Sequence, residues 1–168
     1  MSDEELKIRD AGDGDWPAVW PFFQRIVAAG ETYCYDRDTG EQRGREIWMQ
    51  PPPGRTVVAV DGRGTVLGSA KMGPNQMGGG AHVATASFMV DPHQGRRGIG
   101  RALGEHALAW ARDAGYRSMQ FNAVVECNTR AVALWRSLGF TVIGTVPEAF
   151  HHPTQGYVGL HVMYRRLE

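Results

Sequence analysis

Glycines and arginines are concentrated in residues 90–103, between an apolar, β-prone run and the start of a helical pattern. Gly95, Gly98 and Gly100 let the backbone approach a ligand closely, because they have no Cβ atom. The first turn of a helix has unpaired N–H groups and the positive end of the helix dipole, so it favours a phosphate. Positive charge comes from Arg96, Arg97 and Arg101. We therefore predict a pyrophosphate-binding loop; the alternative is a tight strand–helix connection with solvated arginines.

Two common nucleotide-binding motifs do not match this stretch. The phosphate loop of P-loop proteins ends in Lys-Ser or Lys-Thr, and neither pair occurs here. The dinucleotide-binding loop needs three glycines spaced G-x-G-x-x-G. Gly98-Ile99-Gly100 supplies the first two of these glycines, but Leu103 stands where the third is required.

The composition is that of an ordinary globular protein, and its length predicts one domain over residues 1–168. The 18 Lys and Arg balance the 18 Asp and Glu, which argues against a nucleic-acid-binding protein with a broad basic face. Cys34 and Cys127 form no paired motif, so we expect neither a disulfide framework nor a zinc site. The N-terminus is acidic, and no apolar run approaches the roughly 18 residues of a membrane span. We expect a cytoplasmic protein without a metal ion.

Hydrophobic periodicity and turn residues divide the chain into helices and strands. Asp15 and Pro17 mark the start of the first helix, and Gly30 marks its end. Residues 147–156 are predicted to form a long polar loop on the substrate side. The predicted order is strand 6–9, helices 16–29 and 42–49, strands 56–60, 65–71 and 81–90, helix 99–114, strand 117–125, helix 128–138, and strands 140–146 and 157–165. This order predicts a mixed sheet with helices packed on it.

Two further polar positions attract attention. Asn122 interrupts the β-prone run 121–125, and a buried Asn in a strand needs hydrogen-bond partners. It either bonds a neighbouring loop or faces a substrate. Tyr33 lies in the aromatic, polar segment 31–35 between two helices. This segment either packs two tyrosines over the core or forms one wall of a substrate pocket.

Two local patterns, separated by a strand, resemble the GCN5-related N-acetyltransferase (GNAT) superfamily. The first is the loop and helix start at 97–103, and the second is 128–140, similar to the family's N-x-x-A-x-x-L-Y-x-x-x-G-F. The resemblance covers nearly the whole chain. It implies a mixed α/β fold with about four helices and a mostly antiparallel central sheet of about six or seven strands, the fourth and fifth of which splay apart.

The resemblance implies acetyl-CoA as the donor of an acetyl group. Backbone groups of the fourth strand would bind the pantetheine arm and the thioester, and N–H groups of the loop would hold the pyrophosphate. The helix start at 128 would meet the pantetheine, with a helix N-cap as its other role. The implied cofactor-binding residues are Phe88, Met89, Val90, Gly95, Arg96, Arg97, Gly98, Ile99, Gly100, Arg101, Asn128 and Trp135.

The chain departs from the family's pattern at two places. Relatives carry Gln or Arg three positions before the glycine that corresponds to Gly98, whereas this chain has Gly95 there, followed by Arg96. We expect this difference to be tolerated, because backbone N–H groups do most of the binding. Trp135 stands where many relatives have a Tyr that protonates the leaving thiolate. An indole N–H can donate a hydrogen bond but has no accessible acidity. The coenzyme A thiolate is a fair leaving group, with a pKa of roughly 8.5, so solvent can protonate it.

The implied reaction is attack of a neutral amine on the thioester carbonyl. It needs removal of the ammonium proton, stabilisation of the oxyanion, and positioning. The resemblance assigns the oxyanion donor to the Met89 backbone N–H. His82 and Glu126 are the candidate general bases, with a water relay as the third possibility. Asn122 would face the amine, its carboxylate or the oxyanion.

Strands four and five also look like those of fungal acetyltransferases that act on proline analogues, with Thr85 where those enzymes carry Asn. This resemblance implies a small amino acid or secondary amine as acceptor, bound near Tyr33, Thr85 and Asn122. The alternatives are a protein or peptide N-acetyltransferase and a non-catalytic acyl-CoA-binding module. The alternating strand at 157–165 suggests a homodimer formed along a sheet edge.

Overall fold

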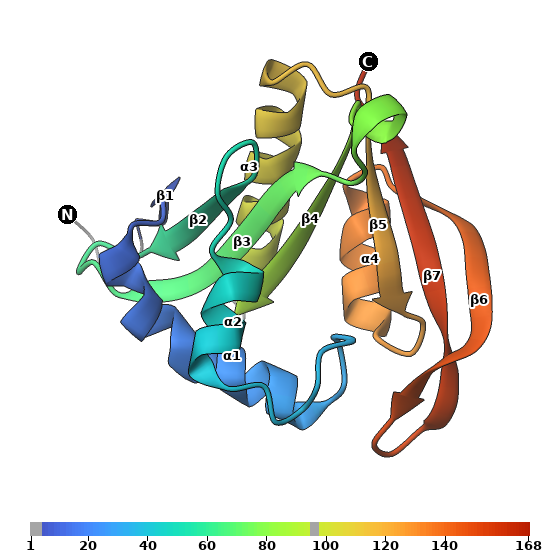
Figure 1. Cartoon of the computed structure of the whole chain (residues 1–168), viewed down its shortest axis with the longest axis horizontal. Helices are drawn as coiled ribbons and strands as arrows, with labels where there is room; N and C mark the ends of the chain where they lie inside the picture. Colours follow the sequence, from blue (N-terminus) through green and yellow to red (C-terminus); the bar gives the residue numbers. More distant parts are fainter. Residues whose placement is uncertain (1–4, 95–97) are drawn as a thin grey trace.

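A computed structural model describes residues 5–94 and 98–168 of the chain (Figure 1). Within them lie four α-helices and seven strands, which confirms the predicted mixed α/β fold. The elements are β1 (Lys7–Asp10), α1 (Trp16–Ala29), α2 (Glu41–Trp48), β2 (Arg55–Val60), β3 (Val66–Pro74), β4 (Val83–Val90), α3 (Ile99–Asp113), β5 (Ser118–Val125), α4 (Thr129–Ser137), β6 (Thr141–His152) and β7 (Gly156–Arg166), with short 3-10 turns at 13–15, 78–80 and 92–94.

The seven strands form one twisted sheet in the order β1-β2-β3-β4-β5-β7-β6. Its neighbouring strands are antiparallel except β4 and β5, which are parallel. The β4–β5 ladder contains only the pairs Val83↔Ser118 and Ala84↔Met119. Beyond these pairs the two strands diverge, as Figure 1 shows. The predicted splay of the fourth and fifth strands is therefore present.

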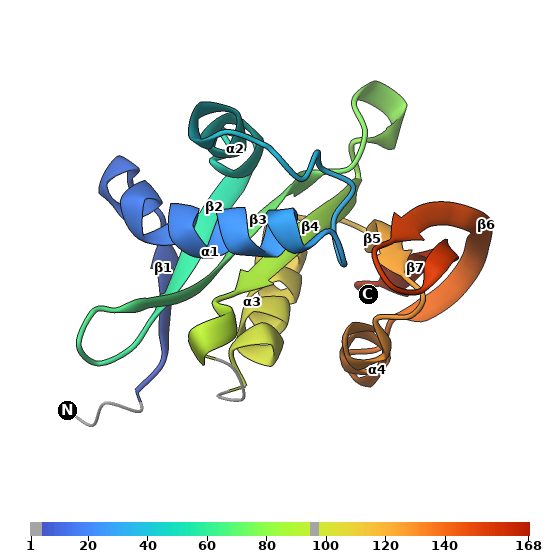
Figure 2. The same cartoon turned by 90° about the horizontal axis from the view of Figure 1, so that it is seen from below.

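Helices cover both faces of the sheet (Figure 2), with α1 and α2 on one face and α3 and α4 on the other. Two core clusters follow from this arrangement. One contains Phe22, Phe23 and Trp48 from α1 and α2, and the other contains buried side chains of α3, α4 and the opposite sheet face. In the described part of the chain, no helix is both long and apolar enough to span a membrane.

Gly68 of β3 allows α3 to begin close to the sheet. A Cβ atom at this position would lie 2.8 Å from the Met89 carbonyl oxygen and 3.1 Å from Ile99 Cγ2. Contacts this short displace their neighbours, and a backbone oxygen in a paired strand cannot yield easily. The missing side chain thus fixes the first turn of α3 against the end of β4, where the predicted phosphate loop lies.

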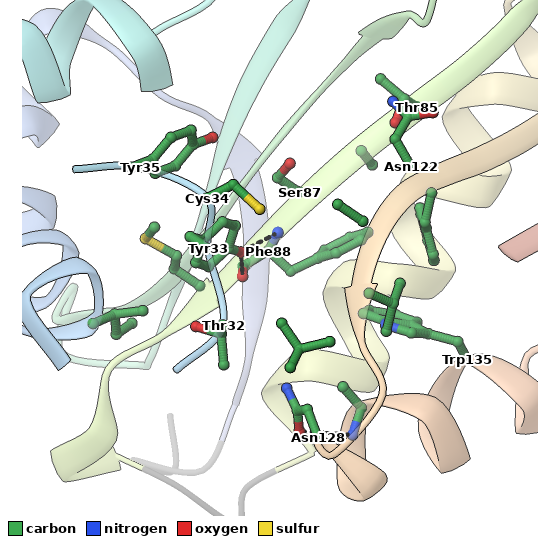
Figure 3. Close-up of a pocket in the computed structure, with 18 of the residues that line it drawn as sticks. Thr32, Tyr33, Cys34, Tyr35, Thr85, Ser87, Phe88, Asn122, Asn128 and Trp135 are labelled. Atoms are coloured by element: carbon green, nitrogen blue, oxygen red, sulfur yellow. Dashed lines mark hydrogen bonds between the residues drawn. The ribbon is translucent and has the colours of Figure 1, made fainter. Parts of the chain in front are cut away.

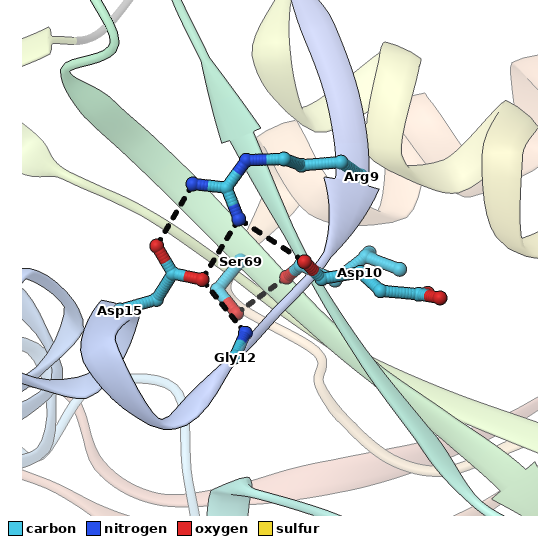
Figure 4. Close-up of polar contacts among 6 residues, drawn as sticks. Arg9, Asp10, Gly12, Asp15 and Ser69 are labelled. Carbon is cyan, nitrogen blue, oxygen red and sulfur yellow. Dashed lines mark hydrogen bonds and ion pairs between the residues drawn. The ribbon is translucent and has the colours of Figure 1, made fainter.

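An ion pair connects β1 to the start of α1 (Figure 4). Both terminal nitrogens of Arg9 donate to the carboxylate oxygens of Asp15, at 2.8 and 2.9 Å. The Gly12 N–H donates to the same carboxylate at 2.7 Å. The hydrogen bonds from Arg9 hold the pKa of Asp15 below its usual range. This pair orients α1, whose C-terminal end leads directly into the segment with Tyr33.

The prediction of a long polar loop at 147–156 is wrong. Strand β6 continues to His152 and pairs with β7 up to His152↔Gly156, so only residues 153–155 form the turn. The register shifts between Val146 and Phe150, and Glu148 has a φ of 51°. A bulge therefore absorbs the irregular residues without ending the strand. No residue of this segment lines the two cavities described below, so it forms no lid over them.

Candidate active site

A cavity of about 420 Å³ opens where the β4–β5 ladder ends (Figure 3). The segment between α1 and α2 closes one side, and α4 closes the other. Of the residues predicted to form the site, eight line it: Tyr33, Thr85, Phe88, Met89, Val90, Asn122, Asn128 and Trp135. The structure therefore brings together side chains and backbone from four parts of the sequence: the segment between α1 and α2, β4, β5, and α4 with its N-cap.

One edge of β4 has backbone groups directed into this cavity. The Asp91 N–H donates to the Leu67 carbonyl, which makes the directly opposed residues 67 and 91 a hydrogen-bonded pair. Alternation along an antiparallel ladder then directs the N–H and C=O of Phe88 away from β3, toward the gap. Met89 pairs with Ser69, so the same alternation directs its N–H into the β3–β4 ladder. The N–H that faces the cavity belongs to Phe88, and the assignment to Met89 needs this correction.

The Tyr33 hydroxyl binds both of these Phe88 groups. It accepts a hydrogen bond from the Phe88 N–H at 3.2 Å and donates one to the Phe88 C=O (Figure 3). The Tyr33 ring stacks on Tyr35, with centroids 5.4 Å apart, and meets Trp48 edge-on. Burial raises the pKa of Tyr33, so its hydroxyl stays protonated and acts as a hydrogen-bonding group.

Aromatic side chains form the wall of the cavity beside α4. Trp135 is 8% exposed and packs against Phe88 and Phe121, with ring centroids 4.7 and 4.9 Å away. Phe121 in turn stacks on Phe140 at 4.3 Å. Trp135 therefore presents a large apolar surface to whatever enters between β4 and β5.

Asn122 lies on β5 just beyond the β4–β5 ladder and makes hydrogen bonds to two other amides. Its Nδ2 donates to Asn75 Oδ1 at 2.7 Å, and its Oδ1 accepts from Asn75 Nδ2 at 3.2 Å and Gln120 Nε2 at 2.9 Å. Asn75 follows β3 directly, so these bonds reach across β4. Asn122 therefore bonds a neighbouring loop, which was one of its two predicted roles. Its side chain also lines the cavity.

Two helix starts lie near the opposite end of the cavity. Asn128 caps α4 by accepting the Ala131 N–H at 3.3 Å, as its N-cap role predicts. Gly98 caps α3 with a φ of 70°, a conformation that favours glycine. The N–H groups of Ile99, Gly100 and Arg101 belong to the first turn, where no partner exists within the helix. The predicted phosphate-binding residues Gly95, Arg96 and Arg97 lie outside the described residues.

The Arg101 side chain points toward α4. Its Nη2 donates to Ser137 Oγ at 2.7 Å, and Glu105 lies 3.7 Å from its guanidinium. The guanidinium is therefore directed away from the helix start. Arg101 can contribute to an anion site there through its backbone N–H and through the long-range attraction of its charge.

Neither predicted base lines this cavity. His82 is exposed just before β4, and its carbonyl accepts the Arg117 N–H where β4 and β5 still pair. Glu126 accepts the Gly159 N–H at 2.6 Å and so continues the β5–β7 contact. Among the described residues that line the cavity, there is no Asp, Glu or His. Thr85, in contrast, lines the cavity.

A second cavity, also about 420 Å³, shares Thr85, Ala86, Ser87 and Asn122 with the first. It extends over β3 toward the prolines that follow α2. Lys71 of β3 contributes the one charged side chain among the described residues that line either cavity. The sequence interpretation missed Lys71; the signal was a lysine inside an otherwise uncharged strand, in a chain with only one other lysine, Lys7.

Comparisons with known proteins agree with this geometry. Residues 17–140 match the family model described as the acetyltransferase (GNAT) family. A solved GCN5-related N-acetyltransferase from Kribbella flavida is 62% identical, with a TM-score of 0.95 over 99% of this chain and 100% of that one. N-acetyltransferase aca1 of Schizosaccharomyces pombe is 31% identical over 84% of this chain and 75% of its own length. The L-methionine sulfoximine/L-methionine sulfone acetyltransferase of Pseudomonas paraeruginosa is 28% identical over 84% and 83%, respectively.

Proposed function

Because the chain belongs to the GNAT acetyltransferase family, with acetyl-CoA as co-substrate, we propose that it acetylates the amine of a small molecule, an amino acid or an amino-acid analogue. One observation carries the proposal: two cavities meet at residues 85–87 and Asn122, one between the splayed strands and one over β3. The first suits the acyl donor and the second suits a small acceptor.

The described residues fit acetyl-CoA. Phe88 offers a C=O on the open edge of β4, which matches an amide of a pantetheine arm, and its N–H is left for the thioester oxygen. Val90 lies two residues further along the same edge. The first-turn N–H groups of α3 suit a pyrophosphate, because Gly98 leaves them accessible and the helix dipole favours an anion. Asn128 and Trp135 line the space between these two ends.

Bound acetyl-CoA supplies an acetyl thioester, whose carbonyl carbon forms the new C–N bond while the C–S bond breaks. We assign the oxyanion donor to the Phe88 N–H, because it faces the cavity. Aromatic walls from Phe121 and Trp135 lower the polarity beside this N–H, which strengthens such a hydrogen bond. The described residues that line the two cavities include no carboxylate or imidazole, so we assign removal of the amine proton to water. Solvent likewise protonates the leaving thiolate, since an indole cannot.

A small acceptor is favoured over a peptide for two reasons. The second cavity is bounded on several sides, by the prolines at 51–53, by residues 71–74 of β3 and by residues 85–87 of β4, so it suits a compact molecule better than an extended peptide. A relative 28% identical is named as an acetyltransferase of two amino-acid analogues, methionine sulfoximine and methionine sulfone.

The deciding experiment measures thiol release from acetyl-CoA with a panel of amino acids, their analogues, polyamines and short peptides, and identifies the N-acetyl products by mass spectrometry. We expect transfer to α-amino acids or close analogues. Transfer to peptides alone would replace the proposal with a peptide acetyltransferase. Thermal stabilisation by acetyl-CoA without transfer to any acceptor would favour the binding-module alternative.

Three lesser parts of the proposal concern the whole molecule. We propose that residues 1–168 are one domain, supported by the single sheet that all seven strands share. A homodimer is supported by the exposed apolar side chains of Ile143, Val146 and Tyr157 on β6 and β7, and analytical ultracentrifugation tests it. A cytoplasmic location is supported by the free state of Cys34 and Cys127.

A further inference from the structure

Lys71 is a half-buried cation without an anionic partner. Its pairing positions, Thr56 on β2 and Ser87 on β4, place it near the middle of the sheet. In the part of the chain that the structure describes, no Asp or Glu lies within ion-pair distance of it. Moving an ammonium out of water without a counter-charge is costly, and burial lowers the pKa of Lys71 for this reason. An arriving anion would remove this cost.

The surroundings hold the ammonium in place. Its Nζ lies 5.7 Å from the centroid of the Tyr35 ring and 5.8 Å from that of the Trp48 ring. One N–H donates to the Ile47 carbonyl at 3.3 Å. An ammonium has three donors, so this contact leaves two for a ligand. The faces of aromatic rings favour the charged form of the amine, which is the form that binds an anion.

Trp48 is itself fixed, which makes this arrangement rigid. Its Nε1 donates to Ser69 Oγ at 2.8 Å, and the Ser69 hydroxyl donates to the Val57 carbonyl at 2.7 Å. Trp48 is fully buried. Ser69 lies two residues before Lys71 on β3, so both side chains lie on the sheet face that α1 and α2 cover.

Lys71 also lies beside the place where the two cavities meet. Its partner in the β3–β4 register is Ser87, and Thr85, two residues earlier on β4, lies on the same face of the sheet. Ser87 and Thr85 line both cavities, whereas Lys71 lines the second. A molecule in the second cavity can therefore reach Lys71 with one end while its other end points toward the open edge of β4.

We propose that the Lys71 ammonium binds the carboxylate of the acceptor, so that the preferred substrates are free α-amino acids held with their amine toward the Phe88 edge of β4. This inference rests on the proposed function, and it assigns recognition of the acceptor's carboxylate to one residue. Lys71 is then a specificity-determining residue, which acts on a part of the acceptor that does not react.

A kinetic comparison tests the proposal with L-methionine sulfone and its primary amide as a fixed pair of acceptors. Lys71→Met removes the charge, Lys71→Arg keeps it, and Lys7→Met is the matched control on exposed β1. We expect Lys71→Met to lower kcat/KM for the acid by about 10- to 100-fold, mostly through KM, with a change of less than about threefold for the amide. Comparing each variant with the wild type cancels the intrinsic difference in amine reactivity. Lys71→Arg restores at least part of the preference for the acid.

A second readout needs no turnover. The chain has two lysines, so deuterated acetic anhydride and mass spectrometry can follow Lys71 with Lys7 as an internal reference. N-acetyl-L-methionine sulfone carries the carboxylate but no reactive amine. We expect it to slow labelling of Lys71 several-fold and to leave Lys7 unchanged, while its primary amide protects neither.

The outcomes separate this inference from the proposed function. Equal losses of kcat for the acid and the amide in both Lys71 variants would overturn it in favour of a general base, because arginine cannot accept the proton. Normal transfer with an unchanged acid preference in Lys71→Met would overturn it and leave the proposed function standing. An absence of transfer to every acceptor in the wild type would overturn both.

Discussion

The Tyr33 hydroxyl hydrogen-bonds the N–H and the C=O of Phe88, the two backbone groups on the open edge of β4 that we assign to acetyl-CoA. Acetyl-CoA therefore competes with a side chain of the protein itself. We predict that Tyr33→Phe binds acetyl-CoA up to about tenfold more tightly, because the competing hydrogen bonds, worth about 1 kcal/mol net, are gone. The unliganded variant loses a similar amount of stability.

Calorimetry with acetyl-CoA and thermal unfolding measure these two effects. Tyr35→Phe is the matched control, since it keeps the ring that stacks on Tyr33 and removes a hydroxyl that does not contact Phe88. Weaker acetyl-CoA binding by Tyr33→Phe would show that the hydroxyl assists the cofactor and does not compete with it.

The reciprocal amide pair of Asn75 and Asn122 gives a second prediction. If the pair serves to hold the end of β3 against β5, then Asn75→Ala and Asn122→Ala each lower the free energy of unfolding by about 1 kcal/mol. The double variant then loses less than the sum of the two, because one interaction has been removed twice. Urea denaturation of the four proteins measures the coupling.

The same variants test whether Asn122 also acts on the acceptor. A fall in kcat of more than about 100-fold in Asn122→Ala, with little change in Asn75→Ala, would show a direct role at the reacting amine. Similar small effects of both variants support the bridging role.

Trp135 gives a third prediction, about proton transfer. We expect Trp135→Phe to keep kcat within about tenfold, because an indole N–H does not protonate a thiolate, whereas loss of a true general acid costs about 100-fold or more. The smaller ring leaves space beside Phe88 and Phe121, so stability falls by about 1 to 2 kcal/mol.

Steady-state kinetics across pH 6–9 make this measurement. Trp110→Phe, in α3 and packed on Tyr116, controls for the loss of a tryptophan elsewhere. A large drop in kcat in Trp135→Phe alone would show that the indole N–H stabilises the departing thiolate by a hydrogen bond, a role that solvent does not replace.

The ion pair between Arg9 and Asp15 gives a fourth prediction, on pH and stability. The pKa of Asp15 is lower in the folded protein than in the unfolded chain, so its contribution is present above about pH 4 and is lost as pH falls through the folded value. Because Arg9 is partly exposed to solvent, we expect this contribution to be at most about 1 kcal/mol.

Asp15→Asn keeps an acceptor for the Gly12 N–H and removes the charge. The difference in unfolding free energy between wild type and variant, measured in urea at pH 7 and pH 3, should therefore shrink at the lower pH. A difference that stays constant would mean that the hydrogen bonds, and not the charge, make the contribution.

The sequence by itself determined the elements and their order. The helix starts at Asp15 and Asn128 and the helix end at Gly30 depend on residues that are close along the chain, so local rules suffice. The glycine-rich helix start and the pattern at 128–140 identified the family for the same reason. The polar segment 147–152 misled this approach, because pairing with β7 stabilises it as a strand despite its composition.

Tertiary structure alone decided which groups face the site. Tyr33 and Phe88 are 55 residues apart, and Asn75 and Asn122 are 47 apart. Local propensities do not determine such long-range contacts, because these contacts depend on the strand register and on how a loop folds over the sheet. The direction of the Met89 N–H and the exposure of Lys71 to the second cavity follow from the same register, in which a shift of one residue reverses every side chain and every backbone group.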